Sequence, residues 1–275
     1  MQLSSALLPD GRTIHCVNSY EVDFSAHEIF GEDLKAYGID LPANGTYVDV
    51  GANIGLFSLY LMDRCPEASV YAFEPMPASF AALERNRDTF AARINALNLG
   101  LGASAGTVEF DYYPAITALS TCNTSTGQEL AGGIKKLLFD SAPGEDMERI
   151  LDKTGVTELR SDAGFADELF RVEKVQARID TLSNQIAALG IEQIDLLKID
   201  TEGNEKEVLS GIAHDDWKRI RQMLVEVHIG RAEMEQIAAD LKGRGFQTVI
   251  GDHPMSQGGA SVFHIYATRA TAAAA

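Results

Sequence analysis

The sequence predicts an α/β protein with a Rossmann-like, mostly parallel, doubly wound sheet and an antiparallel C-terminal hairpin. Three observations support this fold class. Short apolar strands alternate with amphipathic helices along most of the 275 residues, which is the pattern of a parallel sheet covered on both faces. A glycine turn at 51–55 follows directly on one of these strands and opens a helix. The last two strands, 246–250 and 261–267, are joined by a Gly/Pro-rich stretch, as expected of a hairpin.

The first 45 residues are expected to form an N-terminal extension that consists of a strand or hairpin and a helix. The strand or hairpin is expected over 11–24 and the helix over 25–37. Ser25 and Glu28 are spaced as in a capping box, in which the two side chains bond to backbone groups at the start of a helix.

The alternating pattern continues through the rest of the chain. Strand positions are apolar, and helix positions repeat apolar residues three and four apart. The expected elements are the strands 47–50, 70–73 and 94–99 with the helices 54–62 and 77–93, and then the helix 181–189, the strand 194–199, a helix from about 204, the strand 223–227 and the helix 231–243. An extended segment at 107–110 is expected to pair with the strand at 94–99.

Residues 112–175 interrupt this alternation within what is otherwise expected to be a single domain over 1–275. They hold Pro114, Gly132-Gly133 and Pro143-Gly144 between short amphipathic stretches. So long a connection in a compact domain usually has a function. The segment is therefore expected to form a helical lid over an active site, and a helical insert without that role is the alternative.

Composition and charge exclude several classes of function. With 40 acidic and 23 basic side chains the formal net charge is −17, and Lys and Arg form no cluster, so a nucleic-acid partner is not expected. No stretch approaches the ~20 apolar residues of a membrane span, so a cytoplasmic protein without a membrane partner is expected. The three cysteines are widely spaced, which argues against a disulfide framework or a structural zinc site.

The sequence VDVGANIG carries the strongest chemical signal. Gly51 permits a tight turn and a close backbone approach to a ligand, Asn53 tolerates left-handed backbone angles, and Gly55 lets the helix pack against the strand. Asp49 precedes the first glycine by two residues, and Glu74 ends the next strand. A carboxylate at that second position can accept hydrogen bonds from both hydroxyls of an adenosine ribose. Since the GxGxxG pattern of dinucleotide sites is absent, these residues predict S-adenosylmethionine rather than NAD.

Four blocks between 47 and about 228 extend this pattern: VDVGANIGLFSLYL, VYAFEPMPASF, DTLSNQI with LLKIDTEGNEKEVLSGI, and LVEVH. With these blocks the chain resembles the FkbM-type methyltransferases, a branch of the S-adenosylmethionine-dependent class I enzymes. The resemblance implies a class I methyltransferase fold and methylation of hydroxyl oxygens, often on polyketides, macrolides or sugars. The long insert is similar to that of members that work in polyketide or peptide assembly lines. The resemblance leaves open whether the acceptor is free or carrier-bound and whether the chain stands alone or is a domain of a larger synthase. It also leaves the oligomeric state open.

Carried over to this sequence, the resemblance implies a cofactor pocket and a reaction centre. Glu74 would hold the ribose, and Asn98 would approach the adenine. The full set implied in cofactor binding is Asp49, Gly51, Asn53, Gly55, Glu74 and Asn98. The residues implied at the ends of the fourth and fifth strands, where this fold presents the transferable methyl, are Asp200, Glu202 and His228.

Methyl transfer to a hydroxyl gives these residues distinct roles. The donor sulfonium is already activated, so the enzyme mainly aligns donor and acceptor, but the hydroxyl must lose a proton. His228 is predicted to be the general base, because an imidazole with a pKa near ~6.5 can accept a proton at neutral pH. Glu226 shares its strand face and is expected to orient or stabilise the imidazole. Asp200 and Glu202 are expected to bind the hydroxyl or the cofactor's ammonium group, and Lys198 to pair with Asp200.

Several alternatives stay open at this point. Asp200, Glu202 and His228 could instead ligate magnesium or manganese, but no dense acidic cluster with a second histidine is visible in the sequence, so the site is expected to hold no metal. The remaining histidines, His264 among them, are expected in surface or packing roles. The alternative functions are a metal-assisted methyltransferase acting on a sugar, an NAD(P)-dependent oxidoreductase on a similar sheet, and a catalytically silent adenosine-binding module.

Overall fold

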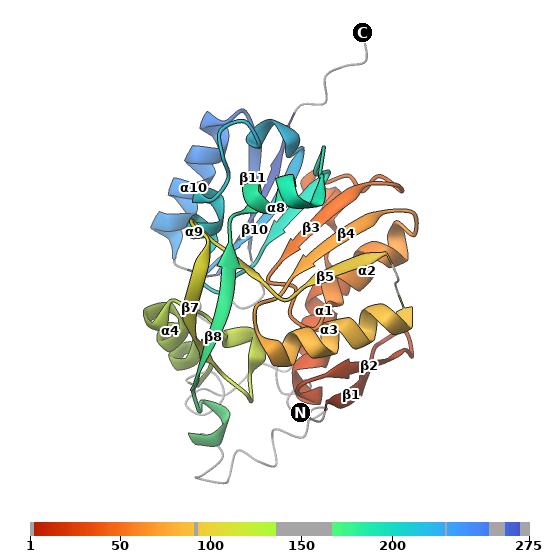
Figure 1. Cartoon of the computed structure of the whole chain (residues 1–275), viewed down its shortest axis with the longest axis vertical. Helices are drawn as coiled ribbons and strands as arrows, with labels where there is room; N and C mark the ends of the chain where they lie inside the picture. The colour runs from red at the N-terminus through yellow and green to blue at the C-terminus, as the bar shows by residue number, and fades with distance from the viewer. Residues whose placement is uncertain (1–2, 91–92, 136–166, 229, 253–261, 270–275) are drawn as a thin grey trace.

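The computed structural model describes residues 3–90, 93–135, 167–228, 230–252 and 262–269 (Figure 1). In this part of the chain a central sheet separates two groups of helices, and a small sheet and an N-terminal hairpin lie beside them. The predicted α/β fold, with a mostly parallel sheet and an antiparallel C-terminal hairpin, is confirmed.

The central sheet contains seven strands within the described residues. In spatial order they are β11 (Gln247–Asp252), β12 (Phe263–Thr268), β10 (Gln222–Val227), β9 (Leu196–Ile199), β3 (Thr46–Val50), β4 (Ser69–Phe73) and β5 (Ile94–Leu97). β12 is antiparallel to both of its neighbours, and the other pairs are parallel. The chain moves outward from β3 to β5 and then returns to β9 on the other side of β3. At such a reversal the loops that follow the two central strands diverge and leave a ligand-sized crevice.

Helices cover both faces of this sheet. One face carries α1 (Ser19–Gly31), α2 (Leu56–Arg64) and α3 (Pro77–Phe90), and the other carries α8 (Leu182–Leu189), α9 (Glu205–Ser210) and α10 (Arg231–Gly243). Side chains alternate between the faces along each strand. In β3, for example, Tyr47 is buried with the first group of helices and Val48 with the second. Both faces are therefore apolar, which explains the continuous apolar runs of the strands.

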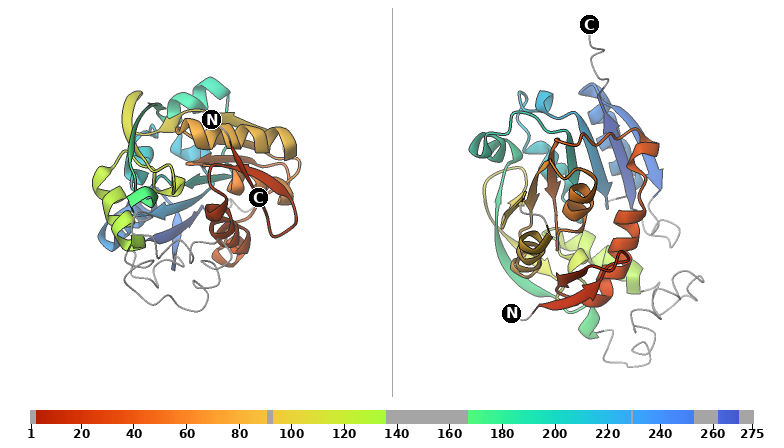
Figure 2. Two further views of the ribbon diagram at one scale, coloured as in Figure 1. Left: turned by 90° about the horizontal axis from the view of Figure 1, so that it is seen from below. Right: turned by 90° about the vertical axis from the view of Figure 1, so that its right-hand side faces the viewer.

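A hairpin of β1 (Ser4–Leu7) and β2 (Thr13–Cys16) precedes α1 and lies at the opposite end of the molecule from β11 and β12 (Figure 2). Asn86 of α3 holds the hairpin in place. Its amide nitrogen donates to the carbonyl oxygen of His15 (2.9 Å), and its oxygen accepts from the N–H of His15 (2.8 Å). The expectation of a strand or hairpin over 11–24 is partly right, because β2 lies there but β1 precedes it.

Helix α1 begins at Ser19 rather than at Ser25, so the predicted capping box is wrong. Ser25 lies inside the helix, and Asn18 is the N-cap. Val22 and Ala26 are both buried in the core. Since residues four apart share one face of a helix, packing of this face against the sheet extends α1 toward the hairpin. The short 3₁₀ helix η1 (Leu34–Tyr37) follows.

The small sheet corrects a second expectation. It pairs β6 (Gly100–Leu101) and β7 (Gly106–Tyr112) with β8 (Glu173–Asp180), in the order β6-β8-β7. The segment 107–110 therefore pairs with β8 and not with the strand at 94–99. Strand periodicity indicates that a segment is extended but not which partner it pairs with, and this partner comes after the whole insert.

The expected insert at 112–175 connects the antiparallel strands β7 and β8. Its described part contains the 3₁₀ helix η2 (Thr117–Leu119) and the helix α4 (Thr124–Lys135), whereas residues 136–166 lie outside the described residues. Its role as a lid and the single-domain division over 1–275 stay predictions.

Two further observations concern the exclusions drawn from composition. Within the described ranges, no helix is both long and apolar enough to cross a bilayer. All three cysteines are free thiols: Cys16, Cys65 and Cys122.

Candidate active site

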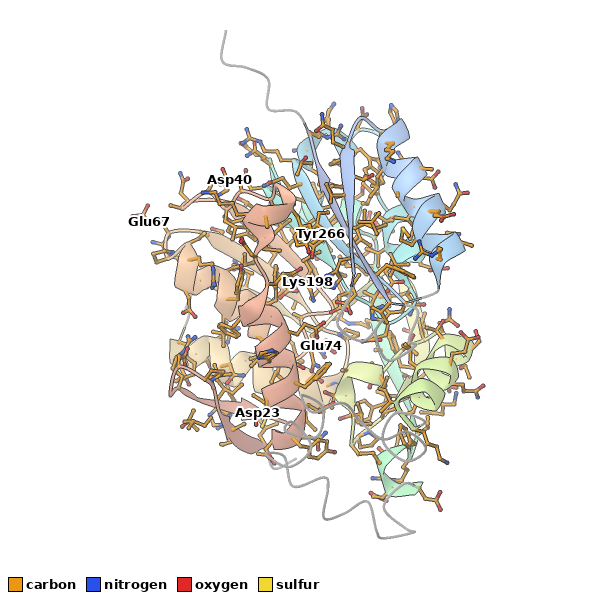
Figure 3. All side chains as sticks on the ribbon, turned by 180° about the vertical axis from the view of Figure 1, so that it is seen from behind. Asp23, Asp40, Glu67, Glu74, Lys198 and Tyr266 are labelled. Carbon is orange, nitrogen blue, oxygen red and sulfur yellow. The ribbon has the colours of Figure 1, made fainter. Side chains whose placement is uncertain are left out.

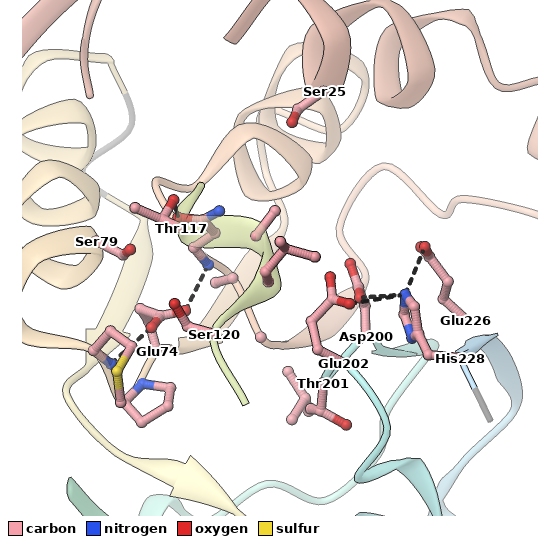
Figure 4. Close-up of a pocket in the computed structure, with 18 of the residues that line it drawn as sticks. Ser25, Glu74, Ser79, Thr117, Ser120, Asp200, Thr201, Glu202, Glu226 and His228 are labelled. Carbon is pink, nitrogen blue, oxygen red and sulfur yellow. Dashed lines mark hydrogen bonds and ion pairs between the residues drawn. The ribbon is translucent and has the colours of Figure 1, made fainter. Parts of the chain in front are cut away.

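A cavity of about 490 Å³ opens at the carboxyl ends of the central strands (Figure 4). Its walls come from α1, from the glycine turn after β3, from η2 and α4 of the insert, and from the ends of β9, β10 and β12. This is the crevice that the reversal of strand order creates. Glu74 and His228, which lie far apart in the sequence, face the same cavity.

The glycine turn brings the ends of β3 and β9 into close contact. Gly51 has a φ of +80°, and a Cβ atom there would lie 1.7 Å from the carbonyl oxygen of Asp200. The close approach that this glycine permits is thus to the backbone after β9. Asn53 adopts the expected left-handed conformation, with a φ of 48°. Gly55 faces Leu83 of α3, where a Cβ would meet Leu83 Cδ1 at 2.5 Å, and it does not line the cavity.

Glu74 lies at the end of β4 and lines the cavity at 5% exposure. Its two oxygens accept hydrogen bonds from the backbone N–H groups of Asn53 (2.8 Å) and Met76 (2.7 Å). Burial raises the pKa of Glu74 to about 7. Each carboxylate oxygen has two lone pairs, so the fixed carboxylate can accept further hydrogen bonds on its cavity side.

Asp49 supports the turn from behind and is not among the residues that line the cavity. It is fully buried, and it accepts a hydrogen bond from the hydroxyl of Ser58 (2.7 Å). Lys198 Nζ lies 3.8 Å from Asp49 and donates to Asp200 at 2.8 Å, so the expected pairing of Lys198 with Asp200 is present. Burial opposes the charge on Lys198, but Asp200 and Asp49 outweigh it and raise its pKa. Lys198 and Glu74 both lie in the interior of the molecule (Figure 3).

Asn98 also lies outside the cavity wall. Its amide donates to the carbonyl oxygens of Glu74 (2.9 Å) and Pro75 (3.1 Å). Asn98 therefore fixes the backbone that carries Glu74. It was expected to approach an adenine, but it does not line the cavity.

His228 follows β10 and is surrounded by carboxylates (Figure 4). Its Nε2 atom lies 3.2 Å from Glu226, 3.3 Å from Glu202 and 4.0 Å from Asp200. Its Nδ1 atom lies 3.1 Å from Glu205, which sits in α9 on the far side of the ring. The four predicted reaction-centre residues thus meet at one point, and Glu205 is an additional member. Glu205 belongs to the same motif, KIDTEGNE, as Asp200 and Glu202. Its place in this motif was the sequence signal that could have assigned it to the site.

These contacts set the charge of the imidazole. Burial alone lowers the pKa of His228, but Glu202, Glu205 and Glu226 outweigh it and raise the pKa well above its ordinary value. The pKa of Glu226 is correspondingly lowered by His228 and by His264, against its own burial. The cluster as it stands therefore favours an imidazolium, which has no lone pair with which to accept a proton.

His264 is a member of the site that the sequence analysis missed. It lies directly opposite Glu226 in the antiparallel register of β10 and β12. Its Nε2 atom is 3.4 Å from Glu226, and its Nδ1 atom is 3.3 Å from Glu32 of the loop after α1. Burial opposes its charge, yet Glu226 and Glu32 raise the pKa of His264 to about 10. The antiparallel pairing of β12 with β10 brings this histidine to the site.

The described part of the insert contacts both ends of the cavity. Thr117 Oγ1 of η2 lies within hydrogen-bond distance of Glu21 Oε2 (3.1 Å) and of Asn53 Oδ1 (3.3 Å). Thr121 donates to the carbonyl oxygen of Glu202 (2.7 Å). The segment between β7 and α4 therefore lies over the line that joins the glycine turn to the His228 cluster.

The strand order, the antiparallel β12 and the cavity at the carboxyl ends of the strands define a class I methyltransferase fold. A solved structure described as methyltransferase FkbM from Methylobacillus flagellatus KT superposes with a TM-score of 0.50 at 12% identity, over 82% of this chain and 44% of that chain. At this identity the likeness concerns the fold alone.

Sequence comparison adds the family. The profile described as the methyltransferase FkbM domain matches residues 49–248. The chain is 34% identical over 269 residues to 31-O-demethyl-FK506 methyltransferase FkbM of Streptomyces tacrolimicus, with 96% of each chain covered. It is also 34% identical over 250 residues to methyltransferase sdnD of Sordaria araneosa, with 86% of each covered. The chain belongs to the FkbM methyltransferase family, as the sequence blocks had indicated.

A third relative is much longer than this chain. The AMB antimetabolite synthetase AmbE of Pseudomonas aeruginosa is 32% identical over 273 residues, which are 95% of this chain and 12% of that protein. A region homologous to this chain thus occurs inside a large synthetase.

Proposed function

We propose that this protein is an S-adenosylmethionine-dependent O-methyltransferase that methylates a hydroxyl group of an apolar small molecule of secondary metabolism. One observation carries the proposal: a single cavity is lined at one end by the glycine turn and Glu74, and at the other end by the cluster around His228. The family is a methyltransferase family, which removes the oxidoreductase alternative.

The residues at the glycine turn fit an adenosine-type cofactor. The buried Glu74 carboxylate is held by two backbone N–H groups and has lone pairs left for a pair of ribose hydroxyls. The turn at Gly51 has no room for a side chain. S-adenosylmethionine would supply the activated methyl group, and the task of the chain would be to bind and orient it.

The acceptor is proposed to lie beneath the insert, because that part of the cavity wall is apolar. Its side chains come from α1 and from the described part of the insert, and they include Phe24, Ile116, Leu119, Leu130 and Leu169. Burying an apolar acceptor against them is favourable at about 25 cal/mol per Å². It also excludes water from the reacting atoms. Two of the relatives, named for FK506 and for an antimetabolite, support a secondary-metabolite acceptor, free or bound to a carrier.

The hydroxyl is proposed to lose its proton at the His228 cluster. His228 is the predicted general base, a role that requires its ring to release the proton that the surrounding carboxylates favour. Glu226 orients the ring through the 3.2 Å contact at Nε2. Asp200 and Glu202, on the same side of the ring, are proposed to position the hydroxyl. In a second arrangement, a metal ion at this cluster would assist the loss of the proton. The carboxylates and the second histidine found there favour this arrangement.

The experiment that tests the proposal follows the methyl group. The purified protein is incubated with S-adenosylmethionine carrying a labelled methyl group and a panel of apolar alcohols, each matched with its methyl ether. We expect labelled ether from at least one alcohol and none from the matched ethers. Label that appears on nitrogen or carbon, or consumption of NADH in a parallel assay, would contradict the proposal.

A further inference from the structure

The cavity end formed by β9, β10 and β12 contains two groups of side chains with the spacing of metal ligands. Among the residues that the structure describes, one group is Asp200, Glu226 and His228. The other is Glu28, Glu226 and His264. Within each group, one candidate ligand atom of every residue lies within 4.8 Å of the others. This is the dense acidic cluster with a second histidine that the sequence analysis did not detect.

Both histidines are oriented as metal-binding histidines are. His228 and His264 each present Nε2 to Glu226, at 3.2 Å and 3.4 Å. Each has its Nδ1 atom held by another carboxylate, Glu205 at 3.1 Å and Glu32 at 3.3 Å. A histidine that binds a metal through one nitrogen usually donates from the other nitrogen to a carboxylate, which fixes the ring. The same arrangement occurs here twice around one shared carboxylate.

The distances in the first group suit a single small ion. Ligand atoms about 2.1 Å from an octahedral ion lie about 3.0 Å apart when adjacent and about 4.2 Å apart when opposite. Nε2 of His228 lies 3.2 Å from Glu226 Oε1 and 4.0 Å from Asp200 Oδ1. Small movements of the two carboxylates would therefore bring all three atoms onto one ion.

Glu205 adds a second observation, which is a buried carboxylate oxygen beside this cluster without a hydrogen-bond partner in the described part of the chain. This side chain is fully buried, with 0% exposure, and its carboxylate faces His228. Its Oε1 atom accepts hydrogen bonds, from the backbone N–H of Gly203 among others, but its Oε2 atom has no hydrogen-bond partner among the described residues. His228 is the shared partner of Glu205 and of three further carboxylates, so a single imidazolium balances only part of the negative charge of this buried cluster.

We propose that Asp200, Glu226 and His228 bind one divalent cation of the manganese or magnesium class. Two carboxylates and one imidazole suit such an ion. They leave about half of its coordination positions for water or for an acceptor hydroxyl, whose pKa the ion would lower. In this arrangement His228 is a ligand rather than a base. The binding of the ion stands by itself, whereas its effect on methyl transfer rests on the proposed function.

The first test is a titration of the EDTA-treated, desalted full chain with Mn²⁺, without any cofactor, in which electron paramagnetic resonance measures free Mn²⁺. We expect saturable binding of one ion per chain and competition by Mg²⁺. Asp200→Asn should weaken binding about 10–100-fold or more. The matched control is Glu207→Gln, which removes an exposed carboxylate of the cavity wall that belongs to neither group. Absence of saturable binding, or equal affinity in wild type and Asp200→Asn, would overturn the proposal.

The second test identifies the nitrogen ligand. Pulsed electron paramagnetic resonance of the Mn²⁺-loaded chain should detect coupling to an imidazole ¹⁴N nucleus. His228→Gln should lose this coupling, and His27→Gln, which changes an exposed histidine of α1, should keep it. Circular dichroism reports whether each variant is folded, and Asp200→Asn carries the test if His228→Gln is not. Binding of S-adenosylhomocysteine in the presence of EDTA is measured separately, so that failure of the metal site and failure of the proposed function are distinguishable.

Discussion

The two ends of the cavity stabilise their buried carboxylates in different ways. At the proposed cofactor end, one buried carboxylate, Glu74, is satisfied by the backbone N–H groups of Asn53 and Met76. At the other end, side chains from four elements bring several carboxylates and two histidines into contact. The first end depends on a local backbone conformation, and the second depends on the pairing of distant strands.

Because of this difference, the two ends should differ in how much stability a substitution costs. The partners of Glu74 are two neutral backbone N–H groups, so its substitution leaves no buried charge without a counter-charge. In the cluster, removal of one member leaves a buried charge without its partner, which is strongly destabilising. The predictions below separate the two ends by affinity, rate and stability.

The largest effect is expected at His228. His228→Gln should lower methyl transfer by about 10²–10⁴-fold, because both the base and the metal-ligand role require an imidazole lone pair. Binding of S-adenosylhomocysteine should stay close to the wild-type value. Single-turnover kinetics measures the rate, and His27→Gln is the control. A rate within twofold of wild type would show that the cluster does not act in the reaction.

The next effect concerns the point where the two ends touch. Gly51→Ala should lower the free energy of unfolding by about 3 kcal/mol or more, since its Cβ would overlap the carbonyl oxygen of Asp200 at a positive φ. Gly132→Ala is the matched control, because this helical glycine has no atom within 4 Å of an added Cβ. That control should gain up to about 1 kcal/mol. Urea denaturation measures both, and equal stability of the two variants would refute the contact.

The cofactor end should respond in affinity rather than in rate. Glu74→Gln replaces one acceptor oxygen by a donor and should weaken S-adenosylhomocysteine binding by about 1.5–3 kcal/mol, which is roughly 10–150-fold. Glu67→Gln changes an exposed carboxylate far from the cavity and should have no effect (Figure 3). Calorimetry measures both. Unchanged affinity in Glu74→Gln would show that Glu74 does not bind the cofactor.

The smallest effect is a pH dependence at the same residue. Burial raises the pKa of Glu74 to about 7. Below this pH the carboxyl is protonated and can accept fewer hydrogen bonds, so cofactor affinity should fall by about fivefold from pH 7 to pH 6. Because folding disfavours the ionised form of Glu74, this group makes the folded protein less stable as the pH rises from about 4.5 to about 7, and the effect levels off above that pH. Glu74→Gln should show a flat affinity profile over this range, and an equal slope in both proteins would assign the dependence elsewhere.

The backbone geometry of the glycine-turn end could be predicted from the sequence because its determinants are local. Gly51, Asn53 and Glu74 belong to two consecutive strand–turn units, and the left-handed backbone at Asn53 is as expected. The local sequence pattern could not predict which residues Gly55 and Asn98 contact. Gly55 packs on α3 because helix packing decides that contact. Asn98 bonds to backbone carbonyls after β4 because β4 and β5 are paired side by side.

The other end could be predicted only in part for the same reason. Asp200 and Glu202 share one motif, and Glu226 and His228 share one strand end, so their meeting followed from adjacent parallel strands. His264 arrives through an antiparallel strand whose register no local pattern indicates. The charge of His228 then depends on how many carboxylates surround it, and only the folded structure shows that number.

The measurement that tests the central claim most directly is calorimetric titration of the wild-type chain with S-adenosylhomocysteine and, separately, with NADH. The account predicts saturable binding of one S-adenosylhomocysteine per chain and no saturable binding of NADH. Absence of S-adenosylhomocysteine binding at millimolar concentration, or saturable binding of NADH at the same cavity, would contradict it.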